Sequence, residues 1–153
     1  IWRENMRLTL KFKYEEDKFI RVCEPFSMPY NNTIKKMDYK EYMDYILENN
    51  ILDEVYLADY IDSSDIDLTK YILDKLIDKT LNDYDIGSQS WDVELENDKV
   101  IISQMYSSED DKKAYIDRKE VVYAMLKWKN FLEGKFDNLD YEEIIDTEDV
   151  YKK

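Results

Sequence analysis

Histidine is absent from this chain of 153 residues, and cysteine occurs once. Without histidine the chain lacks the commonest general base, the commonest zinc ligand and every Ser-His or Cys-His nucleophile. The single cysteine, Cys23, excludes a disulfide within the chain, and its place in the apolar run 19–26 predicts a buried, unreactive thiol. Most familiar hydrolase mechanisms are therefore excluded.

Glycine and proline occur only twice each, which argues against a linker-rich or low-complexity chain, and 44% apolar residues supply material for a core. No window approaches eighteen uninterrupted apolar residues, and no basic segment followed by an apolar run stands at the start. We expect one domain over 1–153 and a cytoplasmic protein. Residues 1–5 precede the first regular pattern and are a candidate non-native leader.

Known site motifs are also missing from the sequence. There is no glycine-rich phosphate loop, no CxxC pair and no basic patch with interleaved aromatic residues. Asp65 and Asp67 have the spacing that opens a calcium loop, but Lys70 replaces its glycine and Leu76 its closing glutamate, so an EF-hand is excluded. We expect no cofactor and no metal.

Charge is the strongest compositional feature. Thirty-six acidic residues against 22 basic ones give a net charge of −14 and an isoelectric point near 4.4. Such a surface repels nucleic acid and anionic membranes and attracts basic proteins. The alternative explanation is that the acidity only keeps the protein soluble.

Two hairpins are predicted from alternating polarity. Residues 6–14 alternate apolar with polar side chains, and 19–23 follow after a polar turn. Residues 91–95 alternate again, a turn follows at 96–99, and 100–102 are β-branched, so we place a second hairpin within 90–106. Both hairpins are expected to contribute to one small antiparallel sheet.

Helical periodicity predicts helices over 38–49, 64–81 and 117–134. Residues 51–61 fit either a helix or a strand, and the spacing of Ile51, Val55 and Ala58 favours a short helix. Ser64 with Asp67, and Asp117 with Glu120, have the spacing of capping boxes, and Gly134 suits a left-handed residue after the last helix. In the acidic C-terminal segment 135–153, Ile144 and its neighbours are expected to dock a short helix. The predicted fold is α+β, a small antiparallel sheet packed with three or four amphipathic helices.

The helix over 38–49 carries an acidic ridge of Asp38, Glu41, Asp44 and Glu48, at spacings of three, three and four residues. Each pair of like charges at these spacings destabilises a helix by about 0.2–0.5 kcal/mol. We expect no lysine four residues away to offset the charge of Glu41 or Asp44. The inner face is expected to hold Tyr39, Met43, Ile46 and Leu47. Residues 53–67 then contain six acids and no basic residue.

Tyrosines interleaved with these acids have the composition of a surface that holds a basic protein, because the rings supply contact area and the acids supply steering. A solvated surface is an equally good explanation for Tyr45 and Tyr60. The predicted partner-binding residues are Asp38, Glu41, Asp44, Tyr45, Glu48, Asp59, Tyr60, Asp62 and Asp65.

A third of the chain resembles a known family through its pattern of core residues. The resemblance rests on Trp91-Asp-Val-Glu-Leu, Val100-Ile-Ile-Ser, Tyr115-Ile-Asp and Ala124-Met-Leu-Lys-Trp128-Lys-Asn-Phe131-Leu132. These segments look like the C-terminal half of small bacterial immunity proteins of contact-dependent growth inhibition and related polymorphic toxin systems. The resemblance implies a cytoplasmic antidote that binds a toxin domain, often a basic nuclease, and blocks its active site or substrate groove. The resemblance assigns no toxin-binding residue in this chain.

The expected partner is thus a cognate basic toxin, with no nucleic acid and no membrane, bound by a monomer or weak dimer. Three other functions stay open at this point, of which a structural or adaptor subunit is the simplest, and two have a definite chemistry. One is a nucleic-acid mimic that inhibits a defence nuclease, and the other is a metal-dependent enzyme built on carboxylates. An enzyme requires three or more acids facing into a buried cleft, whereas a mimic requires acids spaced along an elongated face.

Overall fold

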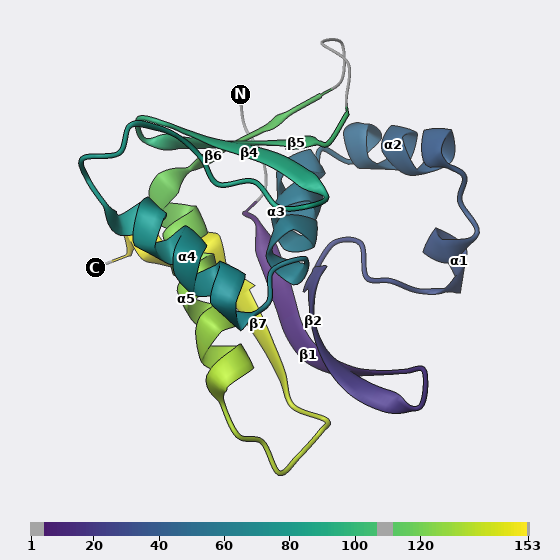
Figure 1. Ribbon diagram of the computed structural model, residues 1–153. Coiled ribbons are helices and arrows are strands. Elements are labelled where there is room, and N and C mark those ends of the chain that lie inside the picture. The colour runs from purple at the N-terminus through teal and green to yellow at the C-terminus, as the bar shows by residue number, and fades with distance from the viewer. Residues whose placement is uncertain (1–4, 107–111, 153) are drawn as a thin grey trace.

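The computed structural model describes residues 5–106 and 112–152. Within them the chain forms five α-helices, one 3-10 helix and two antiparallel sheets (Figure 1). The predicted α+β class is confirmed. The two predicted hairpins also form, but they belong to separate sheets instead of sharing one.

The first sheet has the strand order β2-β1-β7, with β1 (Arg7–Glu15) between β2 (Lys18–Pro25) and β7 (Glu142–Asp146). Leu10 lies opposite Cys23 on one side and Glu143 on the other. The β1–β2 turn places Glu16 and Asp17 at φ values of 51° and 65°, the left-handed region that glycine and asparagine favour.

The second sheet has the order β3-β4-β5-β6, formed by β3 (Asp83–Asp85), β4 (Trp91–Glu96), β5 (Lys99–Gln104) and β6 (Ala114–Asp117). Side chains of β4 alternate between buried and exposed, as the sequence pattern predicts. Two of its strands, β3 and β6, were not anticipated. Each is only three or four residues long, too short for a periodic pattern.

Helices α3 (Leu52–Asp62), α4 (Ile66–Ile77) and α5 (Arg118–Glu133) lie on one side of the second sheet (Figure 1). Residues from these helices and from both sheets form one cluster of buried side chains. Helix α3 packs against strands of both sheets and is largely buried, which explains its weak amphipathic pattern. Helices α1 (Asn32–Lys35) and α2 (Tyr39–Glu48) extend away at one side.

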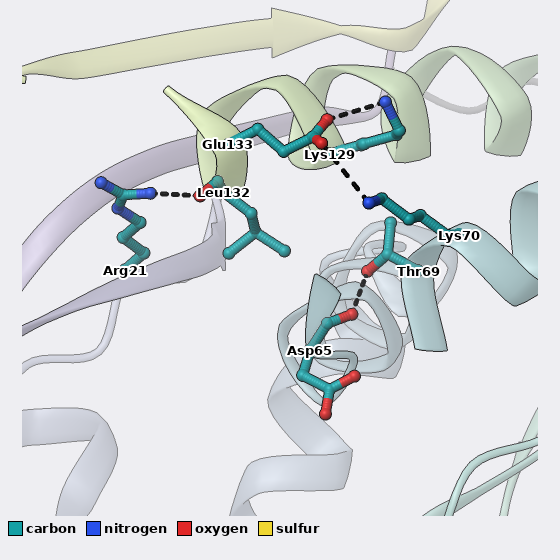
Figure 2. A network of polar contacts seen from close by, with 7 residues as sticks. All are labelled: Arg21, Asp65, Thr69, Lys70, Lys129, Leu132 and Glu133. Carbon is teal, nitrogen blue, oxygen red and sulfur yellow. Dashed lines mark hydrogen bonds and ion pairs between the residues drawn. The ribbon is translucent and has the colours of Figure 1, made fainter. Parts of the chain in front are cut away.

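Helix α5 ends differently from the prediction. Gly134 has φ −71°, so no left-handed residue follows the helix. Instead Arg21 of β2 donates to the carbonyl oxygens of Phe131 (3.0 Å), Leu132 and Gly134 (2.9 Å), which takes up free acceptors of the last turn. Figure 2 shows the contact of Arg21 with Leu132. Glycine is still required there, because a Cβ at Gly134 would lie 2.7 Å from the Phe136 ring.

The predicted capping boxes at the starts of α4 and α5 are also wrong. At α5, no side chain caps the helix, since Asp117 pairs with Lys99 and Tyr151. At α4, Asp65 is the N-cap and accepts from the Leu68 amide at 2.8 Å. Ser64 instead donates to the Ile61 carbonyl at the end of α3.

The C-terminal segment forms strand β7 and a 3-10 helix, η1 (Thr147–Tyr151), and not the short docked α-helix that was predicted. β7 pairs with the edge of β1 that β2 leaves open. Ile145 is buried on the sheet while Ile144 is exposed, as strand alternation requires. Backbone pairing with a strand 130 residues earlier is not visible in the local sequence pattern.

Candidate functional site

The five predicted partner-binding residues of α2 lie at the surface. Asp38, Glu41, Asp44 and Glu48 are exposed, and Tyr45 is 36% exposed. The expected inner face is only partly correct. Ile46 alone is fully buried, whereas Tyr39 and Leu47 are 61% and 43% exposed, because α2 touches the rest of the protein along a narrow strip.

The acidic ridge of α2 is better compensated than the sequence reading implied. Lys40 lies four residues before Asp44 and forms an ion pair with it at 3.0 Å, so the expectation that no lysine relieves Asp44 is wrong. Asp38 and Glu41 form a reciprocal capping box at the start of the helix. Three of the four acids therefore have a role within α2 itself.

Acids of α3 hold this helix against the start of β1, the open edge of β2 and the loop that follows β2. Glu54 is buried and accepts from the amides of Arg7 (3.0 Å) and Ser27 (2.8 Å). Asp62 accepts from the Cys23 amide at 2.9 Å. Because amides outside the sheet ladder otherwise lack partners, both carboxylates satisfy the backbone, and Asp62 also protects the open edge of β2.

Tyr60 was predicted to contact a partner, and this prediction is wrong. Its side chain is fully buried, and its hydroxyl donates to the Ile86 carbonyl at 2.6 Å. The tyrosine belongs to the core between α3 and the second sheet. Asp65, also predicted, is exposed but serves as the N-cap of α4.

Asp59 and Asp62 approach each other and Glu24 from two elements. The pKa of Asp59 is raised to about 6. Burial raises it, the hydrogen bond that Asp59 accepts from the Tyr30 hydroxyl lowers it, and the charge of Asp62 raises it. Burial likewise raises the pKa of Asp62, to which the charge of Glu24 adds. Glu24 is itself buried, with Oε2 3.2 Å from Lys11 and Oε1 without a hydrogen bond.

In this acid group Glu24 is buried and Asp59 half-buried, whereas Asp62 is exposed. The group meets only part of the condition set for a carboxylate enzyme, and the next question is whether it can bind a metal ion. Among residues 5–106 and 112–152, no set of three or more acidic or cysteine side chains is placed to hold a metal ion. One oxygen of Asp59 accepts from the Tyr30 hydroxyl, and one oxygen of Asp62 accepts from the Cys23 amide. Their arrangement supports a structural role.

The outer face of the second sheet contains a set of acids that sequence reasoning missed. We call it the β3–β4 acidic face; its exposed carboxylates belong to Asp83, Asp85, Asp92, Glu94 and Glu96. Across the two strands Asp83 lies opposite Glu96, and Asp85 lies opposite Glu94. Directly opposed residues have β-carbons about 5 Å apart, so these are two close pairs of like charges.

In the described part of the chain, few positively charged side chains offset the negative charge of the β3–β4 acidic face. No ion pair there includes Asp83, Asp92, Glu94 or Glu96. Lys99 lies opposite Glu96 in the β4–β5 register, but its ammonium pairs with Asp117. Like charges directly opposite each other destabilise a sheet, by a magnitude of about 0.2–1 kcal/mol per pair.

Apolar side chains continue the same face across the sheet. The register aligns Glu94 with Ile101 of β5, and Ile101 with Tyr115 of β6, which is 57% exposed. At the far end of β5, the Tyr39 hydroxyl donates to Gln104 at 2.6 Å and so ties α2 to the sheet. The alternation of 91–96 marks three of these acids as outward-facing, but only the pairing with β3 reveals the like-charge contacts.

The helices of the described residues include none that is both long and apolar enough to cross a membrane.

No solved structure matches this chain. Two proteins of Pasteurella multocida (strain Pm70) are similar to it in sequence. UPF0275 protein PM0493 is 28% identical over 154 residues, which cover 94% of this chain and 99% of that protein. UPF0275 protein PM0489 is 32% identical over 92 residues, 54% of this chain and 67% of that protein.

A family model also matches the chain, and its printed description is a family of unknown function. The match runs over residues 6–151, from the start of the first sheet to the end of η1. It therefore includes both sheets, all five helices and the β3–β4 acidic face. The chain belongs to this family, DUF5376.

Proposed function

We propose that this protein is an immunity protein, an antidote that binds a basic toxin domain in the cytoplasm and covers its active site or substrate groove. The observation that carries the proposal is the β3–β4 acidic face, where Asp83 opposes Glu96 and Asp85 opposes Glu94. This arrangement costs the isolated protein stability. When a cationic partner binds over this face, its positive charges attract the carboxylates and offset the repulsion between them.

The neighbouring side chains support a protein partner. Tyr115 and Ile101 continue the face with apolar surface, and aromatic residues next to charges are typical of binding hot spots. The net charge of −14 steers a basic protein towards the chain and raises the association rate, an effect that falls as salt rises. Helix α2 adds Tyr45 and Glu48 as a flanking contact.

A second candidate, a nucleic-acid mimic that occupies the DNA- or RNA-binding groove of a defence nuclease, draws on the same face. Asp92, Glu94 and Glu96 repeat along β4 at every second residue, which spaces them about 6.6 Å apart. A row of evenly spaced anions competes with a phosphate backbone. The two candidates differ in the partner, which is a growth-inhibiting toxin in the first and a defence enzyme in the second.

The first experiment is affinity capture from the native cell, followed by expression of each captured basic protein with and without this chain. An immunity protein is expected to restore growth against one of them. The affinity should be nanomolar or tighter, and the association rate should fall steeply between low and high salt. A captured enzyme that acts on invading nucleic acid and does not inhibit growth would favour the mimic.

The binding surface is tested by the double variant Asp83→Lys with Glu94→Lys. Each change turns a like-charge pair into an opposite-charge pair, so the variant is expected to gain thermal stability while it loses partner binding. The matched control is Asp74→Lys with Asp140→Lys, two exposed acids away from the sheet that give the same change in net charge. Equal binding by both double variants would refute the assignment to the β3–β4 acidic face.

Glu48→Lys separates the α2 contribution from that of the sheet. Glu48 is exposed at the end of α2, where a cation interacts favourably with the helix dipole, so the helix is expected to survive. Loss of binding in this variant alone would place the main contact on α2.

A further inference from the structure

A concavity lies away from the acidic face, between α4, α5 and η1. It has a volume of about 800 Å³, within the range typical of small-molecule sites. Its walls are mostly apolar, and Ile77, Leu126 and Tyr151 are exposed by 58%, 45% and 44%. We call it the α4–α5 groove.

The wall formed by η1 is anchored to the end of β6 and to α5 by polar contacts, of which the one to α5 is buried. Tyr151 donates its hydroxyl to Asp117, and Thr147 donates to the buried carboxylate of Glu120 at 2.8 Å. On the other side, Arg118 donates to five backbone carbonyls at the end of α4 and in the loops beside it, with donor–acceptor distances from 2.7 to 3.2 Å. The groove is therefore pre-formed by the fold.

The charge of the groove is opposite to that of the whole protein. Lys79, Arg118 and Lys119 line it, against Asp98 and Asp117. Lys99 neutralises Asp117 from outside the groove. Neither Lys79 nor Lys119 has an ion pair in the described part of the chain, whereas seven other lysines do.

The start of α5 adds a further positive contribution. This helix of 16 residues begins at Arg118, beside the groove, and no side chain caps it. Its first amide, that of Arg118, donates to the Asp98 carbonyl at 2.8 Å. The helix N-terminus as a whole still carries a partial positive charge, which favours an anion.

We propose that the α4–α5 groove binds a small amphipathic carboxylate, with its apolar portion against Ile77, Val122 and Leu126 and its carboxylate near Lys79 and Lys119. The groove size suits one ligand with an aliphatic or aromatic tail. The cations provide orientation, since the apolar walls alone do not distinguish the two ends of such a molecule. Arg118 contributes charge only, because all five of its N–H groups are used.

The test uses the full chain and dodecanoate below its micellar concentration, with 1-dodecanol as the neutral analogue, in calorimetry and amide NMR titrations. Saturable binding of dodecanoate is expected, with shifts at 76–82, 118–126 and 150–151. The neutral analogue is expected to bind several-fold more weakly. Lys79→Ala with Lys119→Ala should lower the dodecanoate affinity roughly tenfold, since each exposed ion pair contributes a few-fold.

Lys35→Ala with Lys36→Ala, two exposed lysines at α1, is the matched control and should bind dodecanoate as the wild type does. Leu126→Asp, an exposed position, should abolish binding while thermal unfolding stays cooperative. The proposal fails if dodecanoate does not bind saturably, if its shifts map elsewhere, or if both lysine double variants bind equally. Equal affinity for dodecanol would likewise overturn it.

Discussion

Asp59 makes the stability of the fold depend on pH in a direction that can be measured. Its side chain is largely buried between α3 and Tyr30, and burial, the Tyr30 hydrogen bond and the charge of Asp62 together place its pKa at about 6, against 3.8 for a free side chain. The folded protein therefore holds this proton more tightly than the unfolded chain does. Protonation of Asp59 stabilises the fold.

The sign and size follow from linkage. The stabilisation is fully present below pH 3.8 and is lost as pH rises through about 6. The full shift corresponds to roughly 3 kcal/mol, of which about half is lost between pH 5 and pH 7.5. Asp59→Asn keeps an oxygen that accepts from Tyr30 but cannot ionise, so it is expected to be more stable than the wild type at pH 7.5.

The assay is urea unfolding at pH 5, 6, 6.5 and 7.5, at constant salt. The difference in unfolding free energy between Asp59→Asn and the wild type should grow by about 1.5 kcal/mol from pH 5 to pH 7.5. Asp74→Asn, an exposed control, corrects for the general relief of negative charge. Identical pH slopes in the wild type and Asp59→Asn would refute the reasoning.

Three further predictions concern stability. Arg118→Lys should lower the unfolding free energy by about 2–4 kcal/mol, because an ammonium cannot reach the five carbonyls that the guanidinium binds, and chemical unfolding measures the loss. Glu16→Asn with Asp17→Gly should raise the melting temperature, since the left-handed turn costs a residue other than Gly or Asn about 1 kcal/mol. Glu54→Gln should destabilise by about 1–3 kcal/mol and speed amide exchange at Arg7 and Ser27, because the neutral amide has only one oxygen for two donors. Unchanged exchange would contradict the role of Glu54 as the acceptor of both amides.

Periodicity in the sequence was enough to predict the α+β class, both hairpins and four of the helices. These features depend on side chains close in sequence: the alternation of 91–96 requires one buried face, and the apolar spacing of 118–133 requires a helix. The short partners of those strands, β3, β6 and β7, carry too few residues for a pattern and exist because a longer strand offers them an open edge.

The candidate site was predictable only in part. Exposure of Asp38 and Glu48 follows from helical spacing, but the acids at 54, 59 and 62 looked equally free in the sequence. The structure uses them to bind the start of β1, β2 and the loop after β2. A carboxylate has the same local pattern whether it faces solvent or accepts a distant backbone amide. Tyr60 was misassigned for the same reason.

Local sequence therefore determined which segments are helical or extended and how strongly negative the chain is. Tertiary structure alone decided which of those charges oppose each other, as Asp83 and Glu96 do, and which are satisfied internally. The physical reason is that the energy of a charge depends on its burial and on neighbours within a few ångströms. Those neighbours come from strands and helices far apart in the chain.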